Sequence, residues 1–146
     1  MSETTSLPTL FGRFTAILSE HERFGVTLRR ISAACPALES EHPAIAPDLQ
    51  PGSLIADLFA ELSQHFVVEE AEAYFGTLVQ ERPTLLHRVA ELKAEHGAML
   101  KTITELCAIT ADDPESRGLP TPTRRLITQL EAHEETESEL LREFFS

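Results

Sequence analysis

The sequence is poor in basic residues, with 12 Lys and Arg against 24 Asp and Glu and a formal net charge of −12. Nucleic acids and anionic membrane surfaces are bound by basic faces, so this balance argues against both as partners. Metal cations remain compatible with it. The chain also has only two cysteines, Cys35 and Cys107, which lie far apart and lack CxxC spacing. We therefore expect free thiols in a reducing compartment.

Long apolar runs are also missing. No run approaches the length of about 18 residues that a membrane-spanning helix needs. The N-terminal stretch MSETTSLPTL lacks the basic residues and apolar core of a secretory signal peptide. These absences predict a cytoplasmic protein. The length of 146 residues suits one domain, which we expect to span residues 1–146.

Prolines divide the chain into segments. Cys35-Pro36 is predicted to end a first helix, because proline disfavours a helical continuation. Pro83 is placed to begin a helix, and Thr121-Pro122 form a predicted cap and first residue for the last one. Helices are therefore predicted near residues 7–35, 53–80, 83–110 and 122–145.

Between the breaks, apolar residues recur at three- and four-residue steps and do not alternate as they would in strands. This period is typical of amphipathic helices that face a core. The short connection between the second and third helices makes them antiparallel neighbours. The sequence thus predicts an all-α protein, an antiparallel up-down-up-down four-helix bundle.

Six polar side chains lie on these apolar stripes: His21, His65, Glu69, His96, His133 and Glu137. A buried charge without partners costs several kcal/mol, so the fold must compensate it. A single histidine on an apolar face is more often a hydrogen-bonded core residue than a ligand. Here each of the four predicted helices carries one, about 11–14 residues, or about 17–21 Å, from its start. The six side chains are therefore expected to converge at one level on the bundle axis.

Two helices carry the same HxxxE spacing, His65 to Glu69 and His133 to Glu137. Residues four apart share a helix face, so each pair directs an imidazole and a carboxylate the same way. One such pair is ordinary on a helix surface, whereas two pairs facing two further histidines indicate a metal centre. Six ligands exceed one tetrahedral ion and suit two ions bridged by carboxylates. Without thiolates, the set suits iron or manganese better than structural zinc.

With these residues the chain resembles the hemerythrin-like, or HHE cation-binding, family over nearly its whole length. The likeness is carried by His21, His65-Phe-x-x-Glu69-Glu70, Glu95-His96 and His133-Glu134-x-x-Glu137. The resemblance implies two non-haem iron ions held by the six side chains. It further implies that the two carboxylates bridge the ions beside an oxo or hydroxo group, with manganese or zinc as substitutes. The ligand implied is a small molecule such as O2, NO or peroxide.

Two positions depart from the oxygen-carrying members of that family. Those proteins have a second histidine four residues before the third-helix ligand, where this chain has Leu92. Their last carboxylate is an aspartate five residues after the fourth-helix histidine, where this chain has Ser138, and Glu137 comes one residue earlier. A missing nitrogen leaves at least one coordination position on each ion to water or an exogenous ligand. This favours binding or sensing of O2, NO, iron or redox state over reversible oxygen carriage, with peroxide-decomposing (catalase-like) turnover as the alternative.

The other polar residues are not expected to be metal ligands. Four glutamates flank the predicted ligands: Glu20, Glu70, Glu95 and Glu134. They are expected on solvated helix faces, with contact to a metal or to a ligand ring as the alternative. Tyr74 is expected to pack in the core, with the rim of the centre as the alternative, and His87 is out of phase with His96 and should face away. The ExxH spacing from Glu39 to His42 occurs once, whereas ferritin-like centres need it twice. A bundle with merely structural histidines is the remaining alternative.

Overall fold

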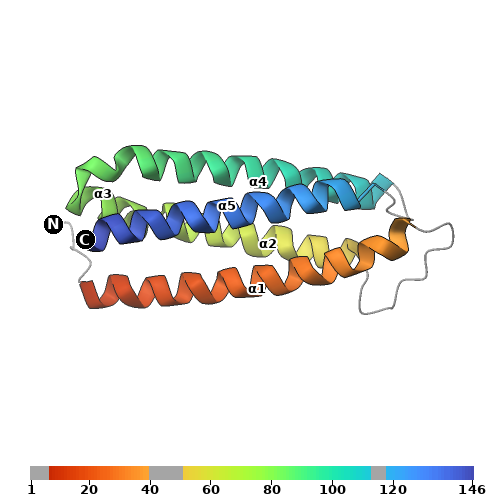
Figure 1. Cartoon of the computed structure of the whole chain (residues 1–146), viewed down its shortest axis with the longest axis horizontal. Helices are drawn as coiled ribbons and strands as arrows, with labels where there is room; N and C mark the ends of the chain where they lie inside the picture. Colours follow the sequence, from red (N-terminus) through yellow and green to blue (C-terminus); the bar gives the residue numbers. More distant parts are fainter. Residues whose placement is uncertain (1–6, 40–50, 113–117) are drawn as a thin grey trace.

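The computed structural model describes residues 7–39, 51–112 and 118–146. Within these ranges the long elements are all helices and no strand occurs: α1 (Leu7–Glu39), α2 (Pro51–Glu70), α4 (Leu86–Asp112) and α5 (Pro120–Phe145). Figure 1 shows that successive long helices run side by side in opposite directions. None of the described helices combines enough length and apolar character to cross a bilayer. The predicted all-α, antiparallel four-helix bundle is thereby confirmed.

The first helix ends later in the sequence than the position of Pro36 predicted. α1 continues through Pro36 to Glu39, although the Cys35-Pro36 pair predicted an end at residue 35. Pro36 lies in the last turn of the helix. Proline there still removes one backbone hydrogen bond and crowds the carbonyl four residues earlier. The helix nevertheless continues for three more residues, so the predicted end at residue 35 was four residues too early.

The last helix begins two residues earlier than predicted. α5 starts at Pro120, and no side chain caps it. The backbone N–H of Thr123 donates to the carbonyl of Leu119 at 3.0 Å. Proline is well suited to the first helical turn, because its missing N–H has no partner there in any case. Pro120 therefore takes the place that was expected for the Thr121-Pro122 pair.

The helix predicted at 53–80 is interrupted just after α2. Ala71 has an extended backbone, with φ −65° and ψ 153°. A π-helical turn, η2 (Glu72–Gly76), and a short helix, α3 (Thr77–Glu81), follow it. A 3-10 turn, η3 (Pro83–Leu85), then leads into α4, so that Pro83 does begin a helical segment as expected.

The π-helical turn changes which residues face the core. The backbone N–H groups of Tyr74 and Gly76 both donate to the carbonyl of Ala71, at 3.0 and 3.4 Å. A bond across five residues widens the turn and shifts the helical phase. Tyr74, five residues after Glu69, is consequently fully buried. A Cβ at Gly76 would lie 3.0 Å from Cγ of Glu72, so this turn favours glycine.

The buried apolar side chains form two clusters rather than one continuous core. The first includes Phe24, Leu28, Ile31, Leu58, Leu62, Phe66, Met99, Ile103, Leu106 and Leu126. The second includes Phe14, Ile17, Tyr74, Phe75, Leu78, Val89, Leu92, Leu140 and Phe144. In α1, α4 and α5 the predicted site residues lie between the two sets of core positions, and in α2 they lie at the end that follows the first cluster. The bundle therefore has an apolar half on either side of a polar layer.

We expect the apolar halves to provide most of the folding free energy. Leu106 is fully buried in the first cluster, whereas Leu86 on the same helix is 61% exposed. Leu106→Ala should lower the free energy of unfolding by about 2–5 kcal/mol, because it leaves a cavity. Leu86→Ala should change it by less than about 0.5 kcal/mol. Urea unfolding followed by circular dichroism measures both, and equal effects would contradict the assigned core.

Candidate metal centre

The six predicted site residues meet in the layer between the two apolar clusters. Each is at most 7% exposed: His21, His65, Glu69, His96, His133 and Glu137. They come from all four long helices, since α1 and α4 contribute one residue each and α2 and α5 two each. The alternation of helix direction brings their middles to one level, as the sequence analysis expected.

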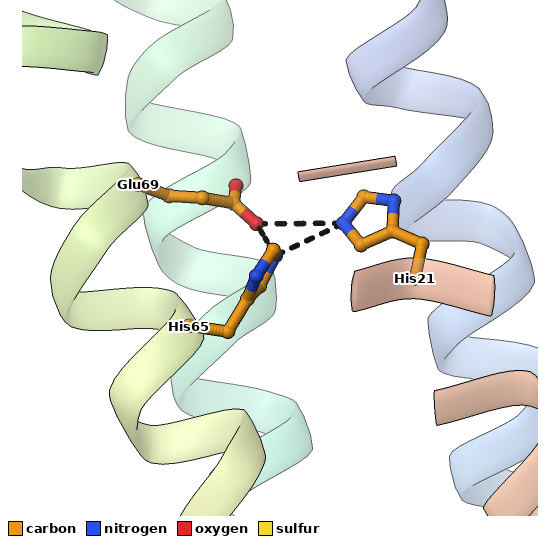
Figure 2. A group of neighbouring side chains, drawn as sticks. All are labelled: His21, His65 and Glu69. Carbon is orange, nitrogen blue, oxygen red and sulfur yellow. Dashed lines mark hydrogen bonds and ion pairs between the residues drawn. The ribbon is translucent and has the colours of Figure 1, made fainter. Parts of the chain in front are cut away.

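One group of three lies between α1 and α2. Figure 2 shows His21 approaching from α1 toward His65 and Glu69 of α2. The Nε2 atoms of His21 and His65 are 3.0 Å apart. Oε1 of Glu69 is 3.6 Å from Nε2 of His21 and also contacts Nε2 of His65. Two imidazole nitrogens and one carboxylate oxygen, all of them atom types that bind metals, thus lie within 4.8 Å of one another.

A second group of three uses the other oxygen of the same carboxylate. Oε2 of Glu69 is 3.4 Å from Nε2 of His96 and 3.8 Å from Nε2 of His133. These two imidazole nitrogens are 3.2 Å apart. The two groups of three within the described residues therefore share Glu69, and each is wide enough to hold a metal ion.

Glu137 adds a carboxylate that faces both groups. Its Oε2 is 3.6 Å from Nε2 of His21 and 3.8 Å from Nε2 of His133. Its other oxygen, Oε1, accepts a hydrogen bond of 2.8 Å from the Tyr74 hydroxyl. Tyr74 thus reaches the polar layer directly, and the expectation that it only packs in the core was incomplete.

The carboxylates in this layer are short of hydrogen-bond donors. Neither oxygen of Glu69 nor Oε2 of Glu137 accepts a hydrogen bond, although all three atoms are buried. A buried carboxylate without donors is costly unless positive charge lies beside it. A cation between the oxygens and the imidazole nitrogens satisfies both kinds of atom, so the residues present fit a bound metal.

Three glutamates outside the layer contact the far side of the imidazoles. Nδ1 of His65 donates to Glu20, and Nδ1 of His133 donates to Glu95 at 2.8 Å. Nδ1 of His96 lies 3.4 Å from Oε2 of Glu70. The expected solvated helix face was wrong for Glu20 and Glu95, which hydrogen-bond to a neighbouring helix, whereas Glu70 is exposed as expected.

These outer contacts settle the tautomers of two rings. A carboxylate can only accept, so Nδ1 of His65 and of His133 must carry the hydrogen. In their neutral forms the lone pairs of both Nε2 atoms then point into the layer. Metal-bound histidines have this same arrangement, with the outer nitrogen held by a carboxylate or carbonyl. Glu20 and Glu95 are therefore positioned to orient the rings of His65 and His133.

Electrostatics in the layer favour a bound positive charge. Burial raises the pKa of Glu69, but the four surrounding imidazoles outweigh burial and lower it overall. Burial lowers the pKa of His65, yet Glu69 and Glu20 together raise it. The pKa of His133 is likewise raised, by Glu69 and Glu95 against burial. Burial and the nearby charge of Glu69 raise the pKa of Glu137. Protons and metal ions thus compete for the same atoms.

The remaining residues singled out from the sequence lie elsewhere. His87 is exposed on α4, in agreement with its phase relative to His96. Glu134 is half-buried, beside the seam between α1 and α5. His42 lies outside the described residues. Of the residues expected elsewhere, Glu20, Glu95 and Tyr74 make hydrogen bonds to the layer and Glu70 lies 3.4 Å from His96. In the sequence, only their nearness to His21, His96 and Glu69 pointed to these contacts.

Comparison with known families supports this arrangement. The hemerythrin HHE cation-binding domain matches residues 13–144, a range that contains all six side chains of the layer. Neither a curated protein nor a solved structure matches the chain significantly. The match covers nearly the whole chain, and the buried groups of histidine and glutamate can hold metal ions. The chain therefore belongs to the hemerythrin HHE cation-binding domain family.

Proposed function

We propose that this protein holds two non-haem iron ions in the polar layer. His21, His65 and Glu69 surround one ion, and His96, His133 and Glu69 surround the other. The observation that carries the proposal is the position of Glu69, whose two oxygens face different histidine pairs. Glu137 lies within 4 Å of one histidine of each pair, so it is the second bridging carboxylate in this proposal. By resemblance to the family, an oxo or hydroxo group would accompany the two carboxylates between the ions.

The choice of iron follows from the donor atoms. Imidazole and carboxylate ligands without thiolate suit iron, with manganese as the nearest substitute. Zinc also binds such ligands, although its structural sites prefer four closed ligands around a single ion. The free thiol of Cys107 suits a reducing compartment, and we keep the cytoplasm as the proposed location.

We further propose that the centre binds or senses a small ligand such as O2 or NO, or reports iron or redox state. Leu92, at the position of a second third-helix histidine in oxygen carriers, is fully buried in the second apolar cluster. Ser138 is exposed beside the layer. Neither supplies a ligand, so coordination positions are left for water or an exogenous molecule. When bound, the irons supply reversible redox chemistry at those positions.

One observation favours an enzymatic alternative, the decomposition of peroxide into water and O2. Tyr74 places a buried phenol proton on Oε1 of Glu137. Burial and the charge of Glu137 raise the pKa of Tyr74, so the hydroxyl keeps its proton as a donor. The phenol therefore positions the Glu137 carboxylate beside the proposed irons, and an oriented carboxylate can accept or return a proton during such turnover.

Removal of one proposed ligand should lower metal content and stability together. Wild-type protein from iron-replete cells should contain about two irons per chain. His65→Ala and Glu137→Ala should each reduce iron content and the Tm of the loaded protein, because metal binding also stabilises the fold. His87→Ala, on the exposed face of α4, should change neither. Metal analysis and calorimetry measure these effects; folded wild-type protein free of metal would refute the proposal.

Loss of an outer carboxylate should weaken the centre without removing a ligand. Glu95→Ala frees Nδ1 of His133, and we expect metal affinity to fall by about 10–100-fold. Glu91→Ala, one turn earlier on α4 and exposed, is the matched control and should leave affinity unchanged. Competition with a chromophoric chelator measures the affinity. Equal affinities in the two variants would show that Glu95 does not support His133.

Peroxide turnover separates the two proposed functions. If the enzymatic alternative holds, loaded wild-type protein should release O2 from added peroxide faster than the same amount of free iron. Tyr74→Phe, which removes the donor to Glu137, should then lower the rate by at least about tenfold while iron content stays near wild type. An oxygen electrode gives the rates. A wild-type rate no higher than that of free iron leaves ligand binding as the function.

A further inference from the structure

A groove runs along the seam between α1 and α5. It has a volume of about 760 Å³, and its walls are largely apolar, with Leu18, Val26, Ile127 and Leu141 among them. Leu18 and Val26 are 55% and 49% exposed, so the groove is open to solvent. It is the larger of the two hollows recorded over the described part of the chain.

The groove reaches the polar layer. His21 and Glu137 both line it. They are also the most exposed of the six layer residues, at 7% and 3%, whereas Glu69 and His133 are fully buried. Oε2 of Glu137 is buried and accepts no hydrogen bond. An unpartnered carboxylate oxygen therefore stands at the inner end of a path from solvent.

The other histidines are covered on their outer sides. Glu20 contacts His65, and the ring of Phe24 packs edge-on against it, with the Phe24 and His65 ring centroids 5.1 Å apart. Phe66 stacks on His96 with ring centroids 3.9 Å apart. Glu95 contacts His133. By contrast, no carboxylate of the described residues contacts Nδ1 of His21. The layer is thus most accessible along α1 and α5.

The charge along this groove is negative. Glu22, Glu131 and Glu134 line it together with Glu137, and Arg29 is its one basic lining residue. Arg29 lies eight residues from His21, about 12 Å along α1 and away from the layer. Carboxylates set in apolar walls focus their field, which raises the local concentration of cations and their rate of arrival.

We propose that this groove is the route by which a divalent metal cation reaches the layer, with Glu22, Glu131 and Glu134 attracting it toward Glu137 and His21. The inference rests on the proposed metal centre and adds a function for residues that are not themselves ligands. A neutral ligand such as NO is not attracted by these carboxylates. Removing their charge should therefore slow the entry of a cation and leave the entry of NO unchanged.

The first test neutralises the three carboxylates. In stopped-flow experiments, Co2+ is mixed with metal-free protein and loading is followed by visible absorption. For E22Q/E131Q/E134Q we expect a loading rate constant at least about tenfold below wild type at low ionic strength, with unchanged final stoichiometry. The difference should nearly vanish at about 1 M salt, where the Debye length is only about 3 Å.

The matched control changes the same number of charges elsewhere. D57N/E81Q/E91Q alters three exposed carboxylates on α2, α3 and α4, none of which lines the groove. Its loading rate should stay within about twofold of wild type, because these charges lie outside the groove, whose apolar walls focus the field of the carboxylates that line it. In iron-loaded protein, the rate of NO binding should be the same in wild type and in both triple variants.

The second test narrows the groove without changing charge. Gly25 lines it, and a Cβ there meets only the Arg29 guanidinium, at 3.5 Å, which is ordinary van der Waals contact, so the side chain of a leucine begins in the groove without a backbone clash. Gly25→Leu should slow Co2+ loading and chelator-driven release by similar factors, with equilibrium affinity unchanged. Gly12→Leu is the control on the same helix, because a Cβ at Gly12 meets nothing within 4 Å. It should change neither rate.

The outcomes of these tests distinguish a failure of the access route from a failure of the proposed metal centre. If wild-type protein binds no Co2+, both the metal centre and the access route are overturned. If wild type loads normally but E22Q/E131Q/E134Q loads as fast as D57N/E81Q/E91Q, the route is wrong and the centre stands. Slower loading confined to the groove variants, and lost at high salt, supports the route.

Discussion

The fold is organised around one carboxylate, that of Glu69, which lies in a dry interior with an imidazole pair on either side. Its oxygens lack hydrogen-bond donors, and four histidine nitrogens approach within 4 Å of them. Such a group is tolerable only where positive charge compensates it. The phase and level of every long helix serve this requirement, since each brings one imidazole to the same height.

The polar layer also explains why the apolar core has two parts. A continuous core would leave no room for six polar side chains, so the leucine and phenylalanine clusters lie on either side of them. The outer glutamates then hold the imidazoles from behind, and Phe66 stacks against one of them. Ligand geometry therefore depends on packing from several helices, which is typical of rigid preorganised centres.

Much of this arrangement could be predicted from the sequence. Proline positions and apolar periodicity indicated the bundle, and the phase of His65 and Glu69 placed them inside it. Tyr74 packs in the core as expected, but its hydrogen bond to Glu137 was not predicted, because the π-helical turn after Ala71 breaks the 3.6-residue period on which such reasoning relies. The contacts of Glu20 with His65 and of Glu95 with His133 were not predicted. Each joins two different helices, and the spacing of residues along one helix carries no information about such contacts. The groove likewise depends on how closely α1 and α5 approach.

The division of the donor atoms along the chain has a consequence for assembly. The N-terminal hairpin of α1 and α2 contains His21, His65 and Glu69, a complete group of three. The C-terminal hairpin of α4 and α5 contains His96 and His133 but borrows its shared carboxylate from α2. A cation bound to the first group would take its three donors from one hairpin and reach the other half of the chain only through Glu137. A cation bound to the second group would already join the two halves through its own three donors, so the two positions are inequivalent.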